Sequence, residues 1–140
     1  MAMYLLDTNI LSELIKKRPN PDLLSHLGSK PAHALFTSCI CVMELRFGGA
    51  LREDFKIFWQ KINKEILSRI NIIPFSEKEA LTAGDLLADI RKNGRNIGME
   101  DVMIAASAIA NKYTVVTANT RHFSRIKGLI VENWLAAPYD

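Results

Sequence analysis

The sequence lacks any apolar run that approaches the ~20 residues needed for a membrane-spanning helix. Its N-terminus also lacks a basic stretch followed by an apolar segment and a small-residue cleavage site, so we expect no signal peptide. These absences predict a cytoplasmic protein. No linker, internal repeat or low-complexity tract interrupts the chain, and its 140 residues are enough to bury a core. Residues 1–140 are therefore expected to form a single domain.

Cysteine is scarce, since Cys39 and Cys41 are the only two in the chain and a single residue separates them. A disulfide across so short a gap would be strained, and no second pair completes a zinc site. We interpret both as small buried hydrophobic residues. Excess charge is also small: the net charge is +3 and the isoelectric point is about 9.0. That balance permits a nucleic-acid partner without requiring one.

Two motifs of other enzyme classes are missing. No strand-like segment is followed by the glycine-rich phosphate loop of a Rossmann module or a P-loop, which counts against nucleotide binding of those types. A phosphotransferase that forms an aspartyl phosphate would carry a second acid two residues after an aspartate at the end of the first strand. Here that aspartate is Asp7, and the later position is Asn9.

Strand-like and helix-like segments alternate along the chain, which predicts an α/β fold with a central parallel β-sheet in a three-layer α/β/α sandwich. The strands are expected at residues 4–6, 34–37, 72–73, 113–117 and 129–131. The helices are expected at about residues 9–17, 21–27, 40–51, 53–70, 76–94 and 99–112. Ser76 and Glu79 form a capping-box signature at the start of the fifth helix.

Glu44 is the most informative residue, because a helix over 40–51 would place it in an apolar stripe. The neighbours on its face are Ile40, Cys41, Phe47, Gly48 and Leu51. A buried carboxylate needs a cation, a hydrogen-bond donor or a proton. An ion pair with Arg or Lys, or a place beside a helix end, would also account for Glu44. Gly48, one turn along, leaves room for a close approach.

Asp101 and Asp7 are two further acids in unexpected places. Asp101 shares its helix face with Ile104, Ala105 and Ala108. The alternative is that Asp101 only stabilises its helix, because the helix dipole favours acids in the first turn. Asp7 ends the apolar segment 4–6, where parallel sheets bind ligands, but it could equally be an N-cap.

A single explanation covers all three acids. Carboxylates that converge repel one another, and hard cations with oxygen ligands relieve that repulsion. Mg²⁺, or alternatively Mn²⁺, is the natural ion for such a site. A metal held this way activates water and neutralises charge at a phosphodiester. We therefore predict a metal site built from Asp7, Glu44 and Asp101.

These residues sit in segments that resemble those of PIN-domain ribonucleases, and within that family the VapC-type toxins of bacterial toxin–antitoxin pairs. The resemblance runs nearly end to end. It rests on Leu6-Asp7-Thr8-Asn9, Glu44-Leu45-Arg46-Phe47-Gly48, Ile97-Gly98, Asp101-Val102-Met103-Ile104-Ala105-Ala106, Thr117-Ala118-Asn119, His122-Phe123 and Gly128-Leu129.

The resemblance implies a PIN-like fold and a Mg²⁺-dependent endoribonuclease that leaves 5′-phosphate and 3′-hydroxyl ends. It implies metal ligation by Asp7, Glu44 and Asp101, with Glu44 either completing the ligand set or acting as general base. The family's fourth acidic position falls on Asn119, which is an amide here. Thr117 would supply a supporting hydroxyl. It further implies a homodimer and an antitoxin whose tail, often with an Arg, enters the acidic groove.

Other polar residues are assigned to supporting hydrogen bonds or to contacts with RNA. Thr8, Asn9 and Asn119 would support the acids by hydrogen bonds. The candidates for contacts to RNA phosphates are Arg91, Lys92, Arg95, Arg121 and Arg125. A solvated charged face is the alternative for those cations, and a surface position is the alternative to a catalytic role for His122. Transfer RNA is one possible substrate.

Two other functions on the same fold stay open at this point. One is a housekeeping nuclease that processes RNA, and the other is a catalytically inactive binding protein. The presence of all three acids counts against the second.

Overall fold

The strands of the computed structural model, which describes residues 2–136, form one fully parallel sheet. They are β1 (Tyr4–Leu6), β2 (Leu35–Ser38), β3 (Asn71–Ile73), β4 (Thr114–Val116) and β5 (Val131–Glu132). Their order across the sheet is β3-β2-β1-β4-β5. The predicted parallel α/β sheet is confirmed, whereas residues 1 and 137–140 of the predicted domain lie outside the described range.

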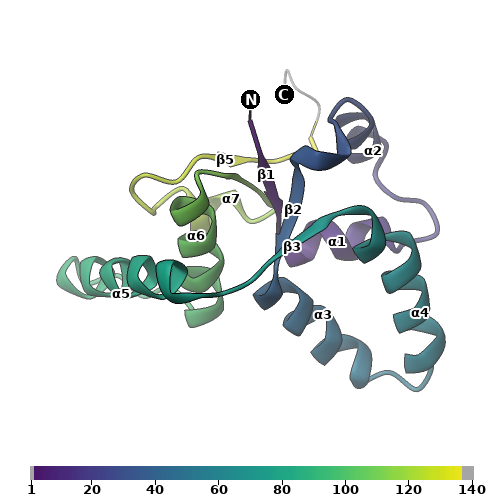
Figure 1. Ribbon diagram of the computed structural model, residues 1–140, viewed down its shortest axis with the longest axis horizontal. Coiled ribbons are helices and arrows are strands. Elements are labelled where there is room, and N and C mark those ends of the chain that lie inside the picture. Colours follow the sequence, from purple (N-terminus) through teal and green to yellow (C-terminus); the bar gives the residue numbers. More distant parts are fainter. Residues whose placement is uncertain (1, 137–140) are drawn as a thin grey trace.

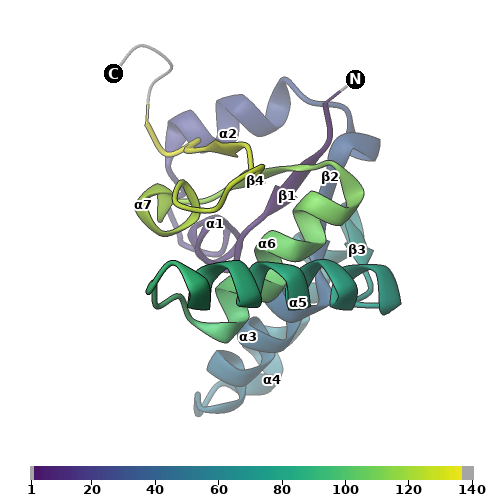
Figure 2. The same cartoon turned by 90° about the vertical axis from the view of Figure 1, so that its left-hand side faces the viewer.

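Helices cover both faces of this sheet (Figure 1). On one side lie α1 (Thr8–Leu14), α2 (Pro21–Gly28), α3 (Cys39–Ala50) and α4 (Phe55–Glu65). On the other side lie α5 (Glu77–Lys92), α6 (Met99–Asn111) and the short α7 (Thr120–Phe123), with α5 packed across α6 (Figure 2). The three-layer prediction is confirmed. Within residues 2–136, no helix combines the length and the apolar character that crossing a membrane would take.

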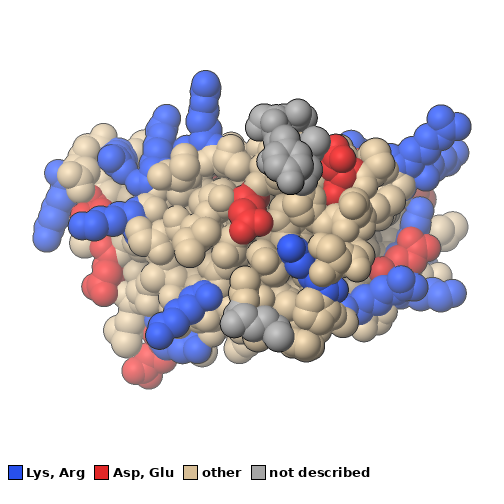
Figure 3. Space-filling model, turned by 90° about the horizontal axis from the view of Figure 1, so that it is seen from above, with Lys and Arg blue, Asp and Glu red and all other residues tan. Residues whose placement is uncertain are grey.

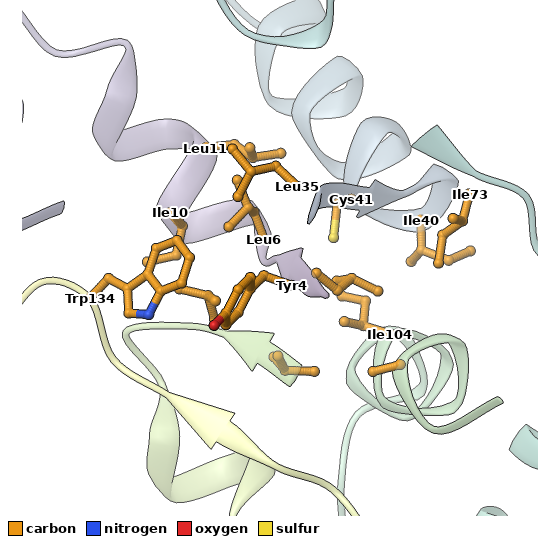
Figure 4. Packing of buried hydrophobic residues seen from close by; sticks show 14 of the residues in the cluster. Tyr4, Leu6, Ile10, Leu11, Leu35, Ile40, Cys41, Ile73, Ile104 and Trp134 are labelled. Carbon is orange, nitrogen blue, oxygen red and sulfur yellow. The ribbon is translucent and has the colours of Figure 1, made fainter. Parts of the chain in front are cut away.

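The core forms around β1, whose residues are all buried between its neighbours β2 and β4. Leu5 pairs in register with Phe36 on one side and Val115 on the other. Figure 4 shows Leu6 of β1 beside Leu11 of α1, and Ile10 of α1 next to Trp134. Trp134 is itself buried and lies 4.9 Å, between ring centroids, from Tyr4. A strand covered on both faces is apolar throughout, as the sequence of β1 indicated.

Two helices are shorter than predicted. The predicted helix 53–70 ends at Glu65, and a 3₁₀ turn, η2 (Leu67–Arg69), leads into β3. Apolar residues continue at helical spacing because Ile66 still packs into the core, although its backbone (φ −120°, ψ −66°) has left the helix. The predicted helix 9–17 ends at Leu14, since the Glu13 carboxylate accepts hydrogen bonds from Lys16 Nζ (2.9 Å) and Asn20 N (3.1 Å) and holds a turn there.

Two adjacent glycines in α3 have different surroundings. A Cβ atom added to Gly49 would lie 2.9 Å from Cε2 of Phe58, so α4 packs closely against α3 at this point. A Cβ added to Gly48 would meet nothing within 4 Å. Only Gly49 is therefore required for helix packing.

The predicted capping box at the start of α5 is present and joins α5 to α6. Glu79 is buried, and its carboxylate accepts hydrogen bonds from Ser76 N (2.9 Å), the Ser76 hydroxyl and Asn111 Nδ2 (2.9 Å). Burial alone would raise the pKa of Glu79, but these hydrogen bonds outweigh it and lower the pKa to about 2. Lys78 Nζ also lies 4.0 Å from the carboxylate. Glu79 is therefore a structural acid that stabilises the fold when it is ionised.

We expect Glu79→Gln to lower the free energy of unfolding at neutral pH by about 1–3 kcal/mol, because an amide replaces a carboxylate that accepts several hydrogen bonds. In the wild type this stabilisation is present above pH 4.5 and is lost as the pH falls toward the folded-state pKa of about 2. The variant should lack that part of the pH dependence. Urea unfolding across this range tests the prediction, with exposed Glu77→Gln on the same helix as the control. Equal stabilities of the two variants would contradict it.

Candidate metal centre

The candidate site lies at the carboxyl edge of the sheet, where β1 and β4 are neighbours. The chain builds β2 and β3 on one side of β1 and β4 and β5 on the other, which makes this the switch point where α/β sheets bind ligands. A groove of about 430 Å³ opens there, which we name the acidic groove. Its lining residues are Asp7, Thr8, Asn9, Ser12, Glu13, Lys16, Glu44, Asp101 and Asn119. The structure thus places all three predicted acids in one groove.

The opposite edge of the sheet, where the strands begin, looks different (Figure 3). Lys and Arg lie mostly around its margins, and the acids visible on this face, one of them near its centre, are separated from one another. No group of acids like that of the acidic groove is visible on this face.

Asp7 follows β1 and is 5% exposed. Its backbone N–H donates to the Val116 carbonyl (2.9 Å), which continues the pairing of β1 with β4. Its side chain is the N-cap of α1 and accepts a hydrogen bond from Thr8 N (2.8 Å). The other carboxylate oxygen accepts hydrogen bonds from Thr117 Oγ1 (2.8 Å) and Asn9 Nδ2 (3.2 Å). Asp7 is thus both a helix cap and the most tightly held acid of the groove.

The supporting polar residues hold two loops together. Thr117 Oγ1 accepts a hydrogen bond from Asn119 N (2.9 Å), and Asn9 Oδ1 accepts one from Ala118 N (3.1 Å). The start of α1 is therefore tied to the segment that follows β4. Asn119 also lines the groove.

Glu44 projects from α3 and is half-buried. Its Oε1 atom accepts a hydrogen bond from Thr8 Oγ1 (2.7 Å). Among the described residues, no Lys or Arg lies within 4.0 Å of the Glu44 or Asp7 carboxylate, so the ion-pair alternative is wrong. The expected apolar stripe is also wrong in part, because Phe47 and Leu51 are 69% and 74% exposed. The side of α3 that packs inward carries Leu45 and Gly49 instead.

Asp101 lies in the first turn of α6, and its side chain is 27% exposed. Its Oδ2 atom lies 3.1 Å from Nδ1 of His122 in α7. Sequence reasoning expected His122 at the surface, and its side chain is 52% exposed, but the contact with Asp101 was missed. Periodicity carries no signal for it, because α7 is only four residues long and a strand separates the partners.

The pKa values of Asp7 and Glu44 are both raised. Burial is the largest cause of the raised pKa of Asp7, and the charge of Asp101 adds to it. Burial is likewise the main reason why the pKa of Glu44 is raised, followed by the charges of Asp7, Asp101 and Glu100. Ionising these two carboxylates therefore costs free energy, and among the described residues no Lys or Arg forms an ion pair with either of them.

Cys41, which was predicted to be only a small buried hydrophobic residue, lies next to the acids of the groove. It is buried, as predicted, but its Sγ atom lies 4.0 Å from Oδ1 of Asp7. One potential ligand atom from each of Asp7, Cys41 and Glu44 lies within 4.8 Å of the others. Burial and the charge of Asp7 raise the pKa of the thiol, so the neutral form is favoured. Asp101 lines the same groove outside this closest group.

The donor set fits a hard divalent cation. A carboxylate has about four lone-pair sites. In Asp7, Oδ2 accepts two hydrogen bonds, whereas Oδ1 accepts one from Thr8 N and a long one, at 4.0 Å, from the Cys41 thiol. A cation that binds Oδ1 would displace this weak contact with the thiol. One or two carboxylates with several waters are typical of Mg²⁺ in proteins.

The cations proposed for RNA phosphates do not line the acidic groove. Arg91 and Lys92 lie at the end of α5, and Arg95 donates to the carbonyl of Arg125. The cation that does line the groove is Lys16, which sequence reasoning missed.

Comparisons with known proteins agree with this geometry. The family model for the PIN domain matches residues 4–129. Ribonuclease VapC2 of Haemophilus influenzae is 35% identical over 135 residues, which cover 96% of this chain and 100% of the relative. The tRNA(fMet)-specific endonuclease VapC of Shigella flexneri is 30% identical over 134 residues, which cover 96% and 99%.

A solved structure is also similar. VapBC2 of Rickettsia felis, bound to a DNA fragment from its promoter, superposes with a TM-score of 0.84 at 34% identity. The match covers 94% of this chain and 98% of that chain. The chain therefore belongs to the PIN domain family and, within it, to the VapC proteins.

Proposed function

We propose that this chain is a Mg²⁺-dependent endoribonuclease and the toxin of a toxin–antitoxin pair. The observation that carries the proposal is the convergence of the Asp7 and Glu44 carboxylates, with Asp101, in one groove where no Lys or Arg among the described residues pairs with them. An uncompensated group of acids is costly to fold and is typical of a functional site. Mn²⁺ is the alternative ion.

Bound in this groove, a divalent cation would neutralise charge on a phosphodiester and activate water for attack. Asp7, Glu44 and Asp101 would hold it. The hydrogen bonds from Thr8, Asn9 and Thr117 fix the orientations of Asp7 and Glu44 in advance. Glu44, the more exposed of these two, would accept the proton of the attacking water as general base. Hydrolysis in this manner leaves 5′-phosphate and 3′-hydroxyl ends.

Partners are proposed from the relatives. The Shigella flexneri protein is named as specific for tRNA(fMet), so transfer RNA is the first substrate to test. VapBC2 of Rickettsia felis was solved bound to promoter DNA, and we propose a cognate antitoxin for this chain too. An Arg from the antitoxin would form an ion pair with Asp7 or Glu44, for which the described residues provide no Lys or Arg partner.

We also propose a homodimer. Met43, Phe47 and Leu51 lie one turn apart along α3 and are 52%, 69% and 74% exposed. Contiguous exposed apolar side chains are typical of protein interfaces.

We expect Asp7→Asn and Asp101→Asn each to reduce cleavage by at least about 100-fold, because each removes a charged ligand while keeping the side-chain shape. Asn still caps a helix, so Asp7→Asn should fold. Cleavage of bulk transfer RNA with Mg²⁺ or with EDTA measures the effect, and exposed Asp85→Asn on α5 is the control. Products should accept a new 5′-phosphate only after phosphatase treatment. Near-normal activity of either variant would remove that residue from the proposed site.

We expect Glu44→Gln to raise the melting temperature by a few degrees in EDTA, because it removes one of the mutually repelling charges while Thr8 keeps its acceptor. A carboxyl group with a raised pKa destabilises the fold when ionised, so the gain should shrink as the pH falls through its pKa. Added Mg²⁺ should stabilise the wild type more than the variant. Exposed Glu53→Gln is the control. A variant that is less stable than the wild type in EDTA would show that Glu44 is a structural acid.

We expect His122 to position Asp101 for the metal rather than to react. His122→Ala should weaken Mn²⁺ binding by about tenfold, as when a hydrogen-bond partner of a metal ligand is lost. His122→Asn should restore affinity because its amide takes the place of Nδ1, whereas His122→Gln, whose amide takes the place of Nε2, should not. Titration calorimetry with Mn²⁺ measures this without turnover. Equal affinities for all these variants and the wild type would exclude the role.

A further inference from the structure

A second groove opens beside the candidate metal centre, between α1, the end of α3 and α4. We name it the basic groove; it includes Lys16, Lys17, Gly48, Arg52, Phe58 and Lys61. Its volume is about 590 Å³. It shares Ser12 and Lys16 with the acidic groove, so the two grooves adjoin each other.

Two cations of the basic groove are already paired with acids. Lys16 Nζ lies 2.9 Å from Glu13 Oε1, and Arg52 Nε lies 2.7 Å from Asp54 Oδ1. These pairs hold their side chains in place and contribute little net charge.

Lys17 and Lys61 give the groove its positive charge. Lys17 is exposed, and Lys61 Nζ donates a hydrogen bond to the Ile15 carbonyl (3.2 Å), which fixes the ammonium group between α4 and α1. An ammonium group has further donors to offer. The groove is thus charged oppositely to the acids beside it and complements the phosphates of a nucleic acid strand.

The same groove has an apolar wall. Ile57 is 74% exposed, and the Arg52 guanidinium lies 4.1 Å from the centroid of the half-buried Phe58 ring. Cations beside apolar and aromatic surface are typical of sites that bind single-stranded nucleic acid, because bases lie against the side chains while phosphates meet the cations.

Gly48 connects the two grooves. It follows Glu44 by one helical turn on the same face of α3, so Glu44 borders the acidic groove where Gly48 borders the basic one. No atom lies within 4 Å of a Cβ added at Gly48, so no packing contact requires glycine there. Glycine in a helix interior costs roughly 0.5–1 kcal/mol relative to alanine. Because Gly48 lines the basic groove, a longer side chain at this position would extend into the open space of the groove.

We infer that the basic groove binds the single-stranded RNA flanking the cleaved bond, with Lys17 and Lys61 on its phosphates and its bases against Ile57 and Phe58. This inference rests on the proposed function. It replaces the cations of α5 and α7 as the main contacts to the RNA backbone.

Gly48→Glu is the discriminating variant, because it adds negative charge to the groove without a clash in the fold. The matched control is Gly84→Glu in α5, where an added Cβ also meets nothing within 4 Å. The probes are fluorescein-labelled oligouridines of about 12 and about 4 nucleotides, with anisotropy measured in EDTA so that binding is separated from cleavage. We expect Gly48→Glu to weaken binding of the longer probe at least tenfold and Gly84→Glu to leave it unchanged. The shorter probe should respond less.

Lys17→Gln gives an independent measurement. It should reduce the slope of log Kd against log salt by about 0.7, the value for one phosphate contact on a single strand. Exposed Lys112→Gln, at the end of α6, is the control and should leave the slope unchanged. Equal affinities of Gly48→Glu and Gly84→Glu for RNA would overturn the inference. The inference would also be overturned if Gly48→Glu lost antitoxin binding but kept RNA binding, because the groove would then bind a protein instead of RNA. Failure of the wild type to cleave RNA, by contrast, would refute the proposed function itself.

Discussion

The structure depends on the enforced proximity of carboxylates at one edge of a parallel sheet. Asp7 cannot leave this edge, because its backbone N–H is paired with Val116 and its side chain caps α1. Glu44 and Asp101 are separated in the sequence by α4, β3 and α5. Nevertheless, Glu44 on α3 and Asp101 on α6 line the same groove. Burial and repulsion raise the pKa values of Asp7 and Glu44, so the fold holds these groups against their electrostatic preference.

Glu79 is a second buried carboxylate in the chain, and its role is structural. It is buried, like Asp7, but Ser76 and Asn111 satisfy its carboxylate and its pKa falls to about 2. Asp7 also accepts several hydrogen bonds, and its pKa still rises. For Asp7, burial outweighs the hydrogen bonds and the charge of Asp101 adds to its effect, whereas for Glu79 the hydrogen bonds from Ser76 and Asn111 outweigh burial. The two buried acids therefore have opposite pKa shifts, and a raised pKa is the kind of perturbation that is common at functional sites.

Much of this site follows from local sequence patterns. The strand end at Asp7 and the helical positions of Glu44 and Asp101 could be predicted, because burial and periodicity are local signals. The partner of Asp101 could not, since His122 reaches it through a four-residue helix after β4. The exposure of Phe47 was also missed, because it depends on where α4 packs. Gly48 and Gly49 are indistinguishable in the sequence, and only the position of Phe58 separates them.

Three positions within two turns of α3 therefore have different roles. Glu44 borders the acidic groove, Gly48 borders the basic groove, and Gly49 admits the Phe58 ring of α4. A Cβ at Gly49 would clash with the Phe58 ring, so the close packing of α4 against α3 depends on this glycine. On the proposed function, the acids would attract the metal and would repel RNA phosphates without it, so a neighbouring surface of opposite charge would favour the approach of one strand to this edge of the sheet.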